Sequence, residues 1–201
     1  MDIQNVKFTL IDLKEPLIDA WRNVFNKDDN FEFIKGDIFS FKPLDCGGLI
    51  ALVSPANSFG YMDGGIDEVY TDEFGEDLQK NLQKIINEKK YGELVVGDAL
   101  IMPIPDTYQG KIPIDLLISA PTMRHPSVVK NSLNAYLAFR AVLIKVDQYN
   151  RRNKNKNKKI KQVICPGLGT SVGEIQVIKC AQQMYLAWAN ILNNQRDYSK
   201  S

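Results

Sequence analysis

The chain alternates short apolar segments with longer amphipathic ones, and this alternation restricts the fold more than any other feature of the sequence. Short apolar runs bounded by turn residues are typical of buried strands, whereas apolar positions three or four residues apart are typical of helices. We expect strands at 7–13, 31–35, 49–53, 99–104, 115–120 and 161–165, and helices at 16–26, 74–89, 127–149 and 174–194. This order predicts an α/β fold, a three-layer α/β/α sandwich with a central mixed, largely parallel sheet.

Length and composition are those of one folded unit. With 201 residues, 44% of them hydrophobic, the chain can bury a sizeable core, and we expect residues 1–201 to form a single domain. The one compositional break is the basic, Asn- and Lys-rich segment 150–161. We expect a surface loop there, because the strand that follows needs sheet neighbours from the first half of the chain. Contact with nucleic acid is the alternative, which a net charge of +1 does not favour.

Cysteine usage and hydropathy predict where the protein works. The three cysteines, Cys46, Cys165 and Cys180, lack CxxC spacing and are odd in number, which argues against a disulfide framework. Asp, His and Cys do not cluster at ligand spacing, so we expect no metal. The sequence has neither a long apolar run nor the order of a signal peptide, and we expect a soluble, monomeric, cytoplasmic protein without a membrane partner.

Two glycine-bearing loops follow apolar strands. Residues 166–173 follow the strand at 161–165, and we expect them to open directly onto a helix. Glycines let consecutive backbone N–H groups point into one concavity, and the start of a helix favours an anion there. The second loop, residues 54–67, follows the strand at 49–53. Because ligands of such folds bind beyond the carboxyl ends of strands, the two loops predict a ligand with a diphosphate.

Three literal motifs in the first loop indicate alternative functions. Residues 169–173 spell GxSxG with Ser171 in the nucleophile position, but the only histidine, His125, precedes that serine instead of following it. Cys165 could begin a phosphatase cradle, but the arginine of such a loop is absent, and we expect a buried strand residue. Residues 167–169 resemble a dinucleotide fingerprint, yet they follow the last strand instead of the first. Each motif alone is weak evidence.

Four segments in the order found here resemble one family. They are Phe33–Ile38, Val53–Ser58, Asp63–Asp67 and Cys165–Gly173. This order is similar to that of macrodomains, which are ADP-ribose-binding α/β/α modules, and the resemblance spans residues 31–188. Residues 120–124 and 134–136 are similar to a branch of stand-alone macrodomains. The resemblance implies that the protein binds ADP-ribose, free or attached to a macromolecule, and requires no cofactor.

The resemblance implies roles for residues at both ends of the ligand. Asp37 corresponds to the carboxylate that accepts a hydrogen bond from the adenine amino group, a donor that guanine lacks at that place. Ile38 would add its backbone N–H and an apolar surface. Asn57 corresponds to the asparagine whose amide holds the hydroxyls of the distal ribose. The alternatives are a turn aspartate at Asp37 and, at Asn57, an amide that satisfies the backbone of its own loop.

The glycine runs are implied to contact the rest of the ligand. Gly64, Gly65 and Ile66 correspond to the run that approaches the distal ribose, although many family members have more glycines here. The opposite loop is implied to wrap the diphosphate through six residues, Gly167, Gly169, Thr170, Ser171, Val172 and Gly173. Alternatively, these glycines are turn residues at a strand-to-helix junction.

Catalysis is implied by an aspartate that follows the second loop. Asp67 corresponds to the aspartate that activates a water in hydrolytic macrodomains, while Asn57 positions the distal ribose. We expect a raised pKa for Asp67, because a diphosphate would lie near its carboxylate. The alternative is that Asp67 caps a short helix around residues 68–70. Thr71 stands where many of these hydrolases have a histidine, which weakens the case for hydrolysis.

The expected function is therefore that of an enzyme at the distal ribose. It would be an ADP-ribosyl hydrolase, or a phosphatase or esterase of an ADP-ribose derivative. The alternative is a non-catalytic reader of ADP-ribose. Arg124 or His125 could contact a phosphate at the rim or be local surface residues, and Phe59 and Tyr61 could cover the ligand or serve as packing anchors.

Overall fold

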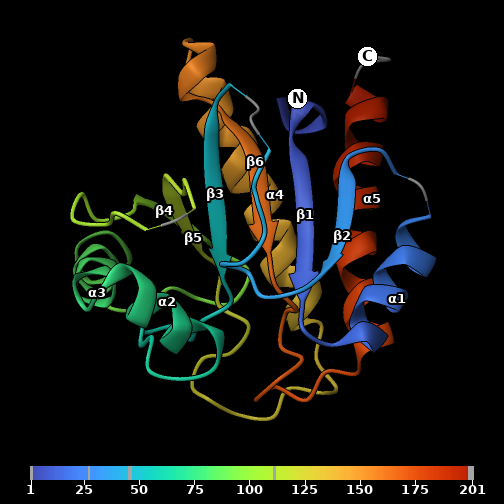
Figure 1. The fold of residues 1–201 in the computed structure, drawn as a ribbon. Helices are drawn as coiled ribbons and strands as arrows, with labels where there is room; N and C mark the ends of the chain where they lie inside the picture. Colours follow the sequence, from blue (N-terminus) through green and yellow to red (C-terminus); the bar gives the residue numbers. More distant parts are fainter. Residues whose placement is uncertain (1, 27, 45–46, 111, 199–201) are drawn as a thin grey trace.

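The computed structural model describes residues 2–26, 28–44, 47–110 and 112–198, and Cys46 lies outside this part of the chain. Its strands and helices alternate along most of the sequence, as Figure 1 shows. The strands are β1 Lys7–Asp12, β2 Phe31–Lys35, β3 Leu49–Ser54, β4 Leu100–Pro103, β5 Leu116–Ser119 and β6 Ile160–Cys165. The α-helices are α1 Glu15–Phe25, α2 Ile66–Phe74, α3 Asp77–Lys90, α4 Asn134–Arg152 and α5 Val177–Tyr198, and two short 3₁₀ helices are η1 Asp2–Asn5 and η2 Lys156–Lys158.

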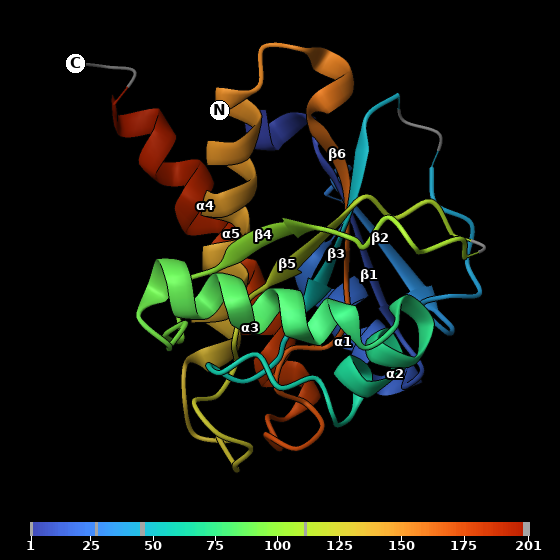
Figure 2. The same ribbon diagram turned by 90° about the vertical axis from the view of Figure 1, so that its left-hand side faces the viewer.

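The strands form one six-stranded sheet in the order β2-β1-β6-β3-β5-β4. Neighbouring strands are parallel except for the antiparallel pair of β4 and β5. Helices α1, α4 and α5 cover one face, and α2 and α3 cover the other (Figures 1 and 2). The predicted α/β/α sandwich with a mixed, largely parallel sheet is therefore confirmed.

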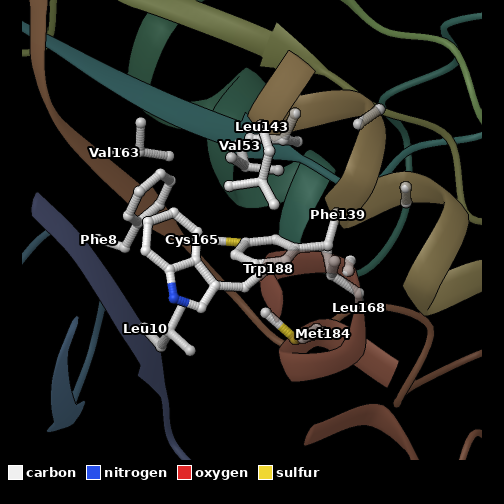
Figure 3. Packing of buried hydrophobic residues seen from close by; sticks show 14 of the residues in the cluster. Phe8, Leu10, Val53, Phe139, Leu143, Val163, Cys165, Leu168, Met184 and Trp188 are labelled. Atoms are coloured by element: carbon white, nitrogen blue, oxygen red, sulfur yellow. The ribbon is translucent and has the colours of Figure 1, made fainter. Parts of the chain in front are cut away.

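Side chains of alternate strand residues fill the two layers between sheet and helices. In β1, Phe8 and Leu10 face the layer of α1, α4 and α5, whereas Ile11 faces α2 and α3. Figure 3 shows the first layer, where Phe8 and Leu10 approach the ring of Trp188. Cys165 is fully buried there, as expected of a strand residue. Successive strand side chains point to opposite faces, so burial on both faces requires the continuous apolar runs seen in the sequence.

The helix predicted at residues 74–89 is in fact the second of two. Helix α2 ends at Phe74, and Gly75 follows with a φ of +86°, a conformation that favours glycine. Helix α3 then begins at Asp77, so Phe74 ends one helix instead of starting the next. The short helix expected around residues 68–70 is part of α2.

Two other helices begin later than predicted. Helix α4 begins at Asn134, because residues before it are bound elsewhere: the Ser127 hydroxyl donates to the His125 carbonyl and does not cap the helix. Helix α5 begins at Val177, three residues after the predicted start at Glu174. Glu174 has a φ of +54°, which separates the glycine-rich loop from the helix. The expectation that this loop opens directly onto a helix is therefore wrong.

The basic segment is more regular than the predicted loop at 150–161. Helix α4 continues to Arg152 and β6 begins at Ile160, so that only residues 153–159, which include η2, connect the two. Asn150 is buried inside the helix, and its side chain exchanges hydrogen bonds of 2.8 and 2.7 Å with the backbone of Ile160. No helix in the described part of the chain is long and apolar enough to cross a membrane.

Candidate functional site

A cavity of about 450 Å³ lies at the carboxyl ends of β1, β2, β3 and β6. This volume lies in the range of small-molecule sites. Every residue that the sequence assigned to ligand binding or catalysis lines this cavity: Asp37, Ile38, Asn57, Gly64, Gly65, Ile66, Asp67, Gly167, Gly169, Thr170, Ser171, Val172 and Gly173. The fold thus brings together loops that are more than a hundred residues apart in the sequence.

The loop after β6 presents backbone donors without partners. Within the described part of the chain, the N–H groups of residues 167–173 donate no hydrogen bond, although the carbonyls of Gly169 and Gly173 accept bonds from Ile175 and Val129. The loop is thus anchored through its carbonyls, and its amides stay available. Consecutive amides of this kind suit an anion, because successive backbone N–H groups can point into one concavity.

A second set of amides lines the same cavity. The N–H groups of residues 64–67, at the start of α2, also lack an acceptor within the described residues. Gly65 is the N-cap of α2, and its φ of +61° with ψ of −133° is a backbone conformation that favours glycine. The start of a helix carries partial positive charge, so this side of the cavity also favours an anion or a sugar hydroxyl.

Glycines in the two loops serve different needs. A Cβ at Gly173 would lie 2.6 Å from the Gly169 carbonyl oxygen, and one at Gly167 would lie 2.6 Å from both Leu17 and Thr170. Gly173 is thus required by the backbone of its own loop, which agrees with the alternative of a turn glycine, whereas a Cβ at Gly167 would meet only the ends of side chains. A Cβ at Gly64 or Gly65 would meet no atom within 4 Å. Those two glycines face open space in the cavity.

Asp67 lies at the base of the cavity with only 6% of its surface exposed. The hydroxyl of Ser54, the last residue of β3, donates a 2.5 Å hydrogen bond to Asp67 Oδ1. Burial raises the pKa of Asp67 to about 7, and the Ser54 bond offsets part of that rise. The capping alternative is not observed, since α2 has no side-chain cap. The raised pKa that the sequence led us to expect is present, but burial is its cause.

Asn57 is held by its own loop. Its Oδ1 accepts from the backbone N–H groups of Phe59 and Tyr61 at 3.0 and 3.3 Å, and its Nδ2 donates to the Tyr61 carbonyl at 2.9 Å. These bonds are those of the alternative in which the amide satisfies loop backbone. One Nδ2 proton has no acceptor within the described residues, and Asn57 lines the cavity. The amide can therefore hold the loop and donate one further bond.

The opposite end of the cavity is formed by the loop after β2. Asp37 is exposed, and its Oδ1 accepts a 2.7 Å bond from the backbone N–H of Phe39, as a turn aspartate does. Its Oδ2 accepts no bond within the described residues. Ile38 beside it is buried and adds an apolar surface. Asp37 Oδ2 can therefore accept a hydrogen bond beside this apolar surface.

Comparison with known proteins assigns the chain to a family. The sequence profile of the Macro domain matches residues 53–184. The chain belongs to the macrodomain family. The profile begins at Val53, so β1, α1 and β2 of this macrodomain, with Asp37 after them, lie before the matched range. An uncharacterized protein of Aquifex aeolicus is 31% identical over 133 residues, which cover 66% of this chain and 68% of that protein.

Several solved structures share the macrodomain fold. The macrodomain of Mycobacterium tuberculosis DarG has a TM-score of 0.58 and 18% identity, covering 78% of this chain and 88% of that one. The Oceanobacillus iheyensis macrodomain with ADP has a TM-score of 0.55 and 19% identity, covering 76% and 70%. Thermosipho africanus DarTG in complex with ADP-ribose has a TM-score of 0.55 and 15% identity, covering 88% of this chain but 49% of that one. At such identities the likeness concerns the fold.

The rim of this macrodomain carries an ordered cluster. Arg124 binds Glu93 through two hydrogen bonds, of 2.8 and 3.1 Å, and its guanidinium lies 5.1 Å from the Phe59 ring centre. The His125 ring packs on Phe59 with centres 4.9 Å apart. Arg124 is thus engaged locally, which agrees with the alternative of a surface residue. Tyr61 is 53% exposed and lines the cavity, so it is not a packing anchor.

The other chemistries considered from the sequence find no support in the site. Ser171 has no hydrogen-bonded base within the described residues, and Cys165 is fully buried with its pKa raised well above the usual value by that burial. The described residues contain no group of three His, Cys, Asp or Glu side chains arranged for a metal ion. Sequence reasoning missed Ser54 as the partner of Asp67, and also Asp12 and Lys14, which line the cavity.

Proposed function

We propose that this macrodomain binds ADP-ribose, free or attached to a macromolecule, and hydrolyses an ADP-ribosyl linkage or an ADP-ribose derivative at the distal ribose. Membership of the family supports the ligand, and the structures of two relatives contain ADP or ADP-ribose. The observation that carries the proposal is the pair of unpartnered amide rows, residues 64–67 and 167–173, whose residues other than Leu168 line one cavity. A diphosphate satisfies such rows without charged side chains.

The roles that the family resemblance implies for the site residues give the proposed ligand a direction. Adenine lies at Asp37 and Ile38 after β2, where Asp37 Oδ2 accepts from the amino group. The diphosphate lies on the loop after β6, and the distal ribose lies between Asn57 and the turn at Gly64–Ile66. The open space at Gly64 and Gly65 accommodates the sugar. At Gly65 the φ of +61° also favours glycine, whereas at Gly64 neither packing nor backbone conformation requires it.

Asp67 is the proposed general base. With a pKa of about 7 it is partly ionised near neutral pH, which suits a base. Ser54 occupies Oδ1 and leaves Oδ2 to take a proton from water. The water oxygen then bonds to the anomeric carbon, and the bond to the leaving group breaks with its electron pair on the leaving atom. Asn57 contributes by orienting the ribose.

A reader without turnover is the second candidate. It requires Asp37, Asn57 and both loops but does not require Asp67. Two observations favour it. The Asn57 amide is already bonded to its own loop. Thr71, which stands where many hydrolases have a histidine, donates a 2.7 Å bond to the Met62 carbonyl and so supports the loop instead of acting on a ligand. We also propose, as the sequence suggested, a single-domain, monomeric protein of the cytoplasm.

Calorimetric titration with ADP-ribose is the first test. We expect saturable binding that Asp37→Ala weakens about tenfold and that guanosine diphosphate ribose does not reproduce, since a hydrogen bond to a charged group is worth about 1.5–3 kcal/mol. Absence of binding at millimolar ADP-ribose would disprove the ligand.

Asp67→Asn separates the two candidates: an enzyme keeps its affinity and loses turnover of ADP-ribosylated substrates about a hundredfold or more, whereas a reader has no turnover in either form.

A further inference from the structure

The cavity is poor in cationic side chains for a site that would take a diphosphate. Among the described residues that line it, Lys14 is the one with a cationic side chain. Four carboxylates line it as well: Asp12, Asp37, Asp63 and Asp67. The amide row at 167–173 already supplies donors for a diphosphate, so the charge of Lys14 is available for a further anionic group of the ligand.

The backbone of Lys14 is fixed, and its ammonium group is unpaired within the described chain. Its N–H donates a 2.9 Å bond to Asp12 Oδ1, and its carbonyl accepts from Leu17 at the first turn of α1. The ammonium has no carboxylate of the described residues within 4 Å. The neighbouring cation Lys35, by contrast, pairs with Glu15 at 3.0 Å. Lys14 therefore has a fixed backbone and an exposed side chain whose charge is uncommitted beside the cavity.

Strand order places Lys14 between two parts of the ligand. It follows β1, which lies in the sheet between β2 and β6, and the ends of all three strands meet at the edge that holds the loops (Figure 1). Asp37, the adenine end, follows β2, and the loop at 167–173, the diphosphate end, follows β6. In ADP-ribose the adenosine ribose joins adenine to the diphosphate. Lys14 is thus at the level of that ribose.

We propose that Lys14 forms a subsite for a phosphate monoester on the adenosine ribose, so that the cavity prefers ADP-ribose phosphorylated at the 2′ or 3′ hydroxyl over ADP-ribose itself. The proposal rests on the proposed function, since it takes the ligand's direction from it. A compact ammonium group binds phosphate as a point charge. The nearby carboxylate of Asp12 would repel a second phosphate, and Lys14 offsets that repulsion.

The test compares three ligands on three proteins by calorimetry. The ligands are ADP-ribose and its 2′-phosphate and 3′-phosphate derivatives; the proteins are the wild type, Lys14→Gln and Lys154→Gln. Lys154 is exposed in the segment between α4 and β6, so its replacement removes the same charge at a distance from the cavity. We expect one phosphorylated derivative to bind the wild type and Lys154→Gln about tenfold more tightly than ADP-ribose does. Lys14→Gln should bind that derivative and ADP-ribose with equal affinity.

Other outcomes overturn the proposal in distinguishable ways. Equal affinities of the wild type for all three ligands would show that no such subsite exists. A Lys14→Gln loss that is the same for ADP-ribose and its derivatives would assign Lys14 to the diphosphate. If none of the three ligands binds, the proposed function itself fails. Raising the salt from about 0.05 to about 0.5 M should reduce the preference, because an exposed charge pair is screened.

Discussion

Asp67 imposes a stability cost that depends on pH. Its pKa is 3.8 in the unfolded chain and about 7 in the fold, so the folded state holds a proton that the unfolded state releases in this window. Stability is therefore highest below about pH 4 for this group and falls as the pH rises to about 7. Asp67→Asn removes the titration, and at about pH 8 it should be more stable than the wild type by up to about 4 kcal/mol.

Urea denaturation of both proteins at about pH 5 and about pH 8 checks this prediction. The difference between them isolates Asp67, since every other titrating group is common to both. A difference that does not grow with pH would mean that Asp67 titrates normally in the folded protein. The Ser54 hydroxyl can donate to an amide oxygen as it does to a carboxylate, so that bond need not be lost.

Single residues of the site were predictable where the sequence contains a motif, and not where the partner is remote. All the assigned residues line one cavity because glycine and asparagine motifs mark the ends of strands, which meet at one edge of a parallel sheet. The sequence identified Ser54 only as a loop residue. Its bond to Asp67 could not be predicted, because that bond depends on how α2 packs against β3. Lys14 carries no motif at all. Its proposed role is argued from the position of β1 in the sheet.

At the scale of elements, the connection between α4 and β6 depends on one buried side chain. Asn150 is 2% exposed and bonds both the N–H and the carbonyl of Ile160. Asn150→Ala removes one hydrogen bond from each of these two backbone groups, and we expect it to lower the free energy of unfolding by about 2–4 kcal/mol. Asn157→Ala, at an exposed position in η2, should change it by less than about 0.5 kcal/mol. Equal effects in urea denaturation would contradict the argument.

An added methyl group is predicted to lower stability in one glycine loop and ligand affinity in the other. Gly173→Ala forces a Cβ to within 2.6 Å of the Gly169 carbonyl, so we expect a loss of about 1–3 kcal/mol of stability. Gly64→Ala meets no protein atom, and it should leave stability within about 0.5 kcal/mol while weakening ADP-ribose binding about tenfold. Thermal melting and calorimetry on both variants measure these effects. If Gly64→Ala bound ADP-ribose normally, the sugar would not lie at this turn.

Helix boundaries were the least predictable feature of the elements. The sequence from 74 to 89 has helical spacing, but it does not reveal that Gly75 takes a positive φ and separates α2 from α3. Residues 127–133 resemble the start of a helix, yet the Val129 N–H bonds the Gly173 carbonyl in the structure. A contact between residues that are distant in sequence thus outweighs local propensity. Strands were located more closely, because burial on both faces leaves continuous apolar runs.

For the whole molecule, the layers could be predicted but the strand order could not. Each central strand is apolar on both faces, so the side-chain pattern does not say which strand is its neighbour. Placing β1 between β2 and β6 brings the first strand beside the last, in register from Lys7 with Gln162 to Leu10 with Cys165. That arrangement sets the order of the loops around the cavity. The same strand order brings α1 and α5, the helices that cover these strands, side by side in one layer.

Two buried tryptophans allow that layer to be tested, because they differ in one hydrogen bond. Trp188 of α5 donates a 2.7 Å bond to Asp28, between α1 and β2, and packs on Phe31. Trp21 of α1 is equally buried, but its N–H has no acceptor within the described chain. Replacement by Phe removes similar ring volume at both positions. At Trp188 it also removes a hydrogen bond to a carboxylate, whereas at Trp21 it removes an unsatisfied donor.

We therefore expect Trp188→Phe to be less stable than Trp21→Phe by about 1.5–3 kcal/mol in urea denaturation. Asp28→Ala is the matched control, because it removes the acceptor and keeps both indole rings. It should lower the stability of the wild type by more than that of Trp188→Phe, in which the bond is already absent. If the two tryptophan variants were equally stable, the bond to Asp28 would add nothing to packing. The contact between α5 and the start of β2 would then depend on the aromatic cluster alone, with Phe31 at its centre.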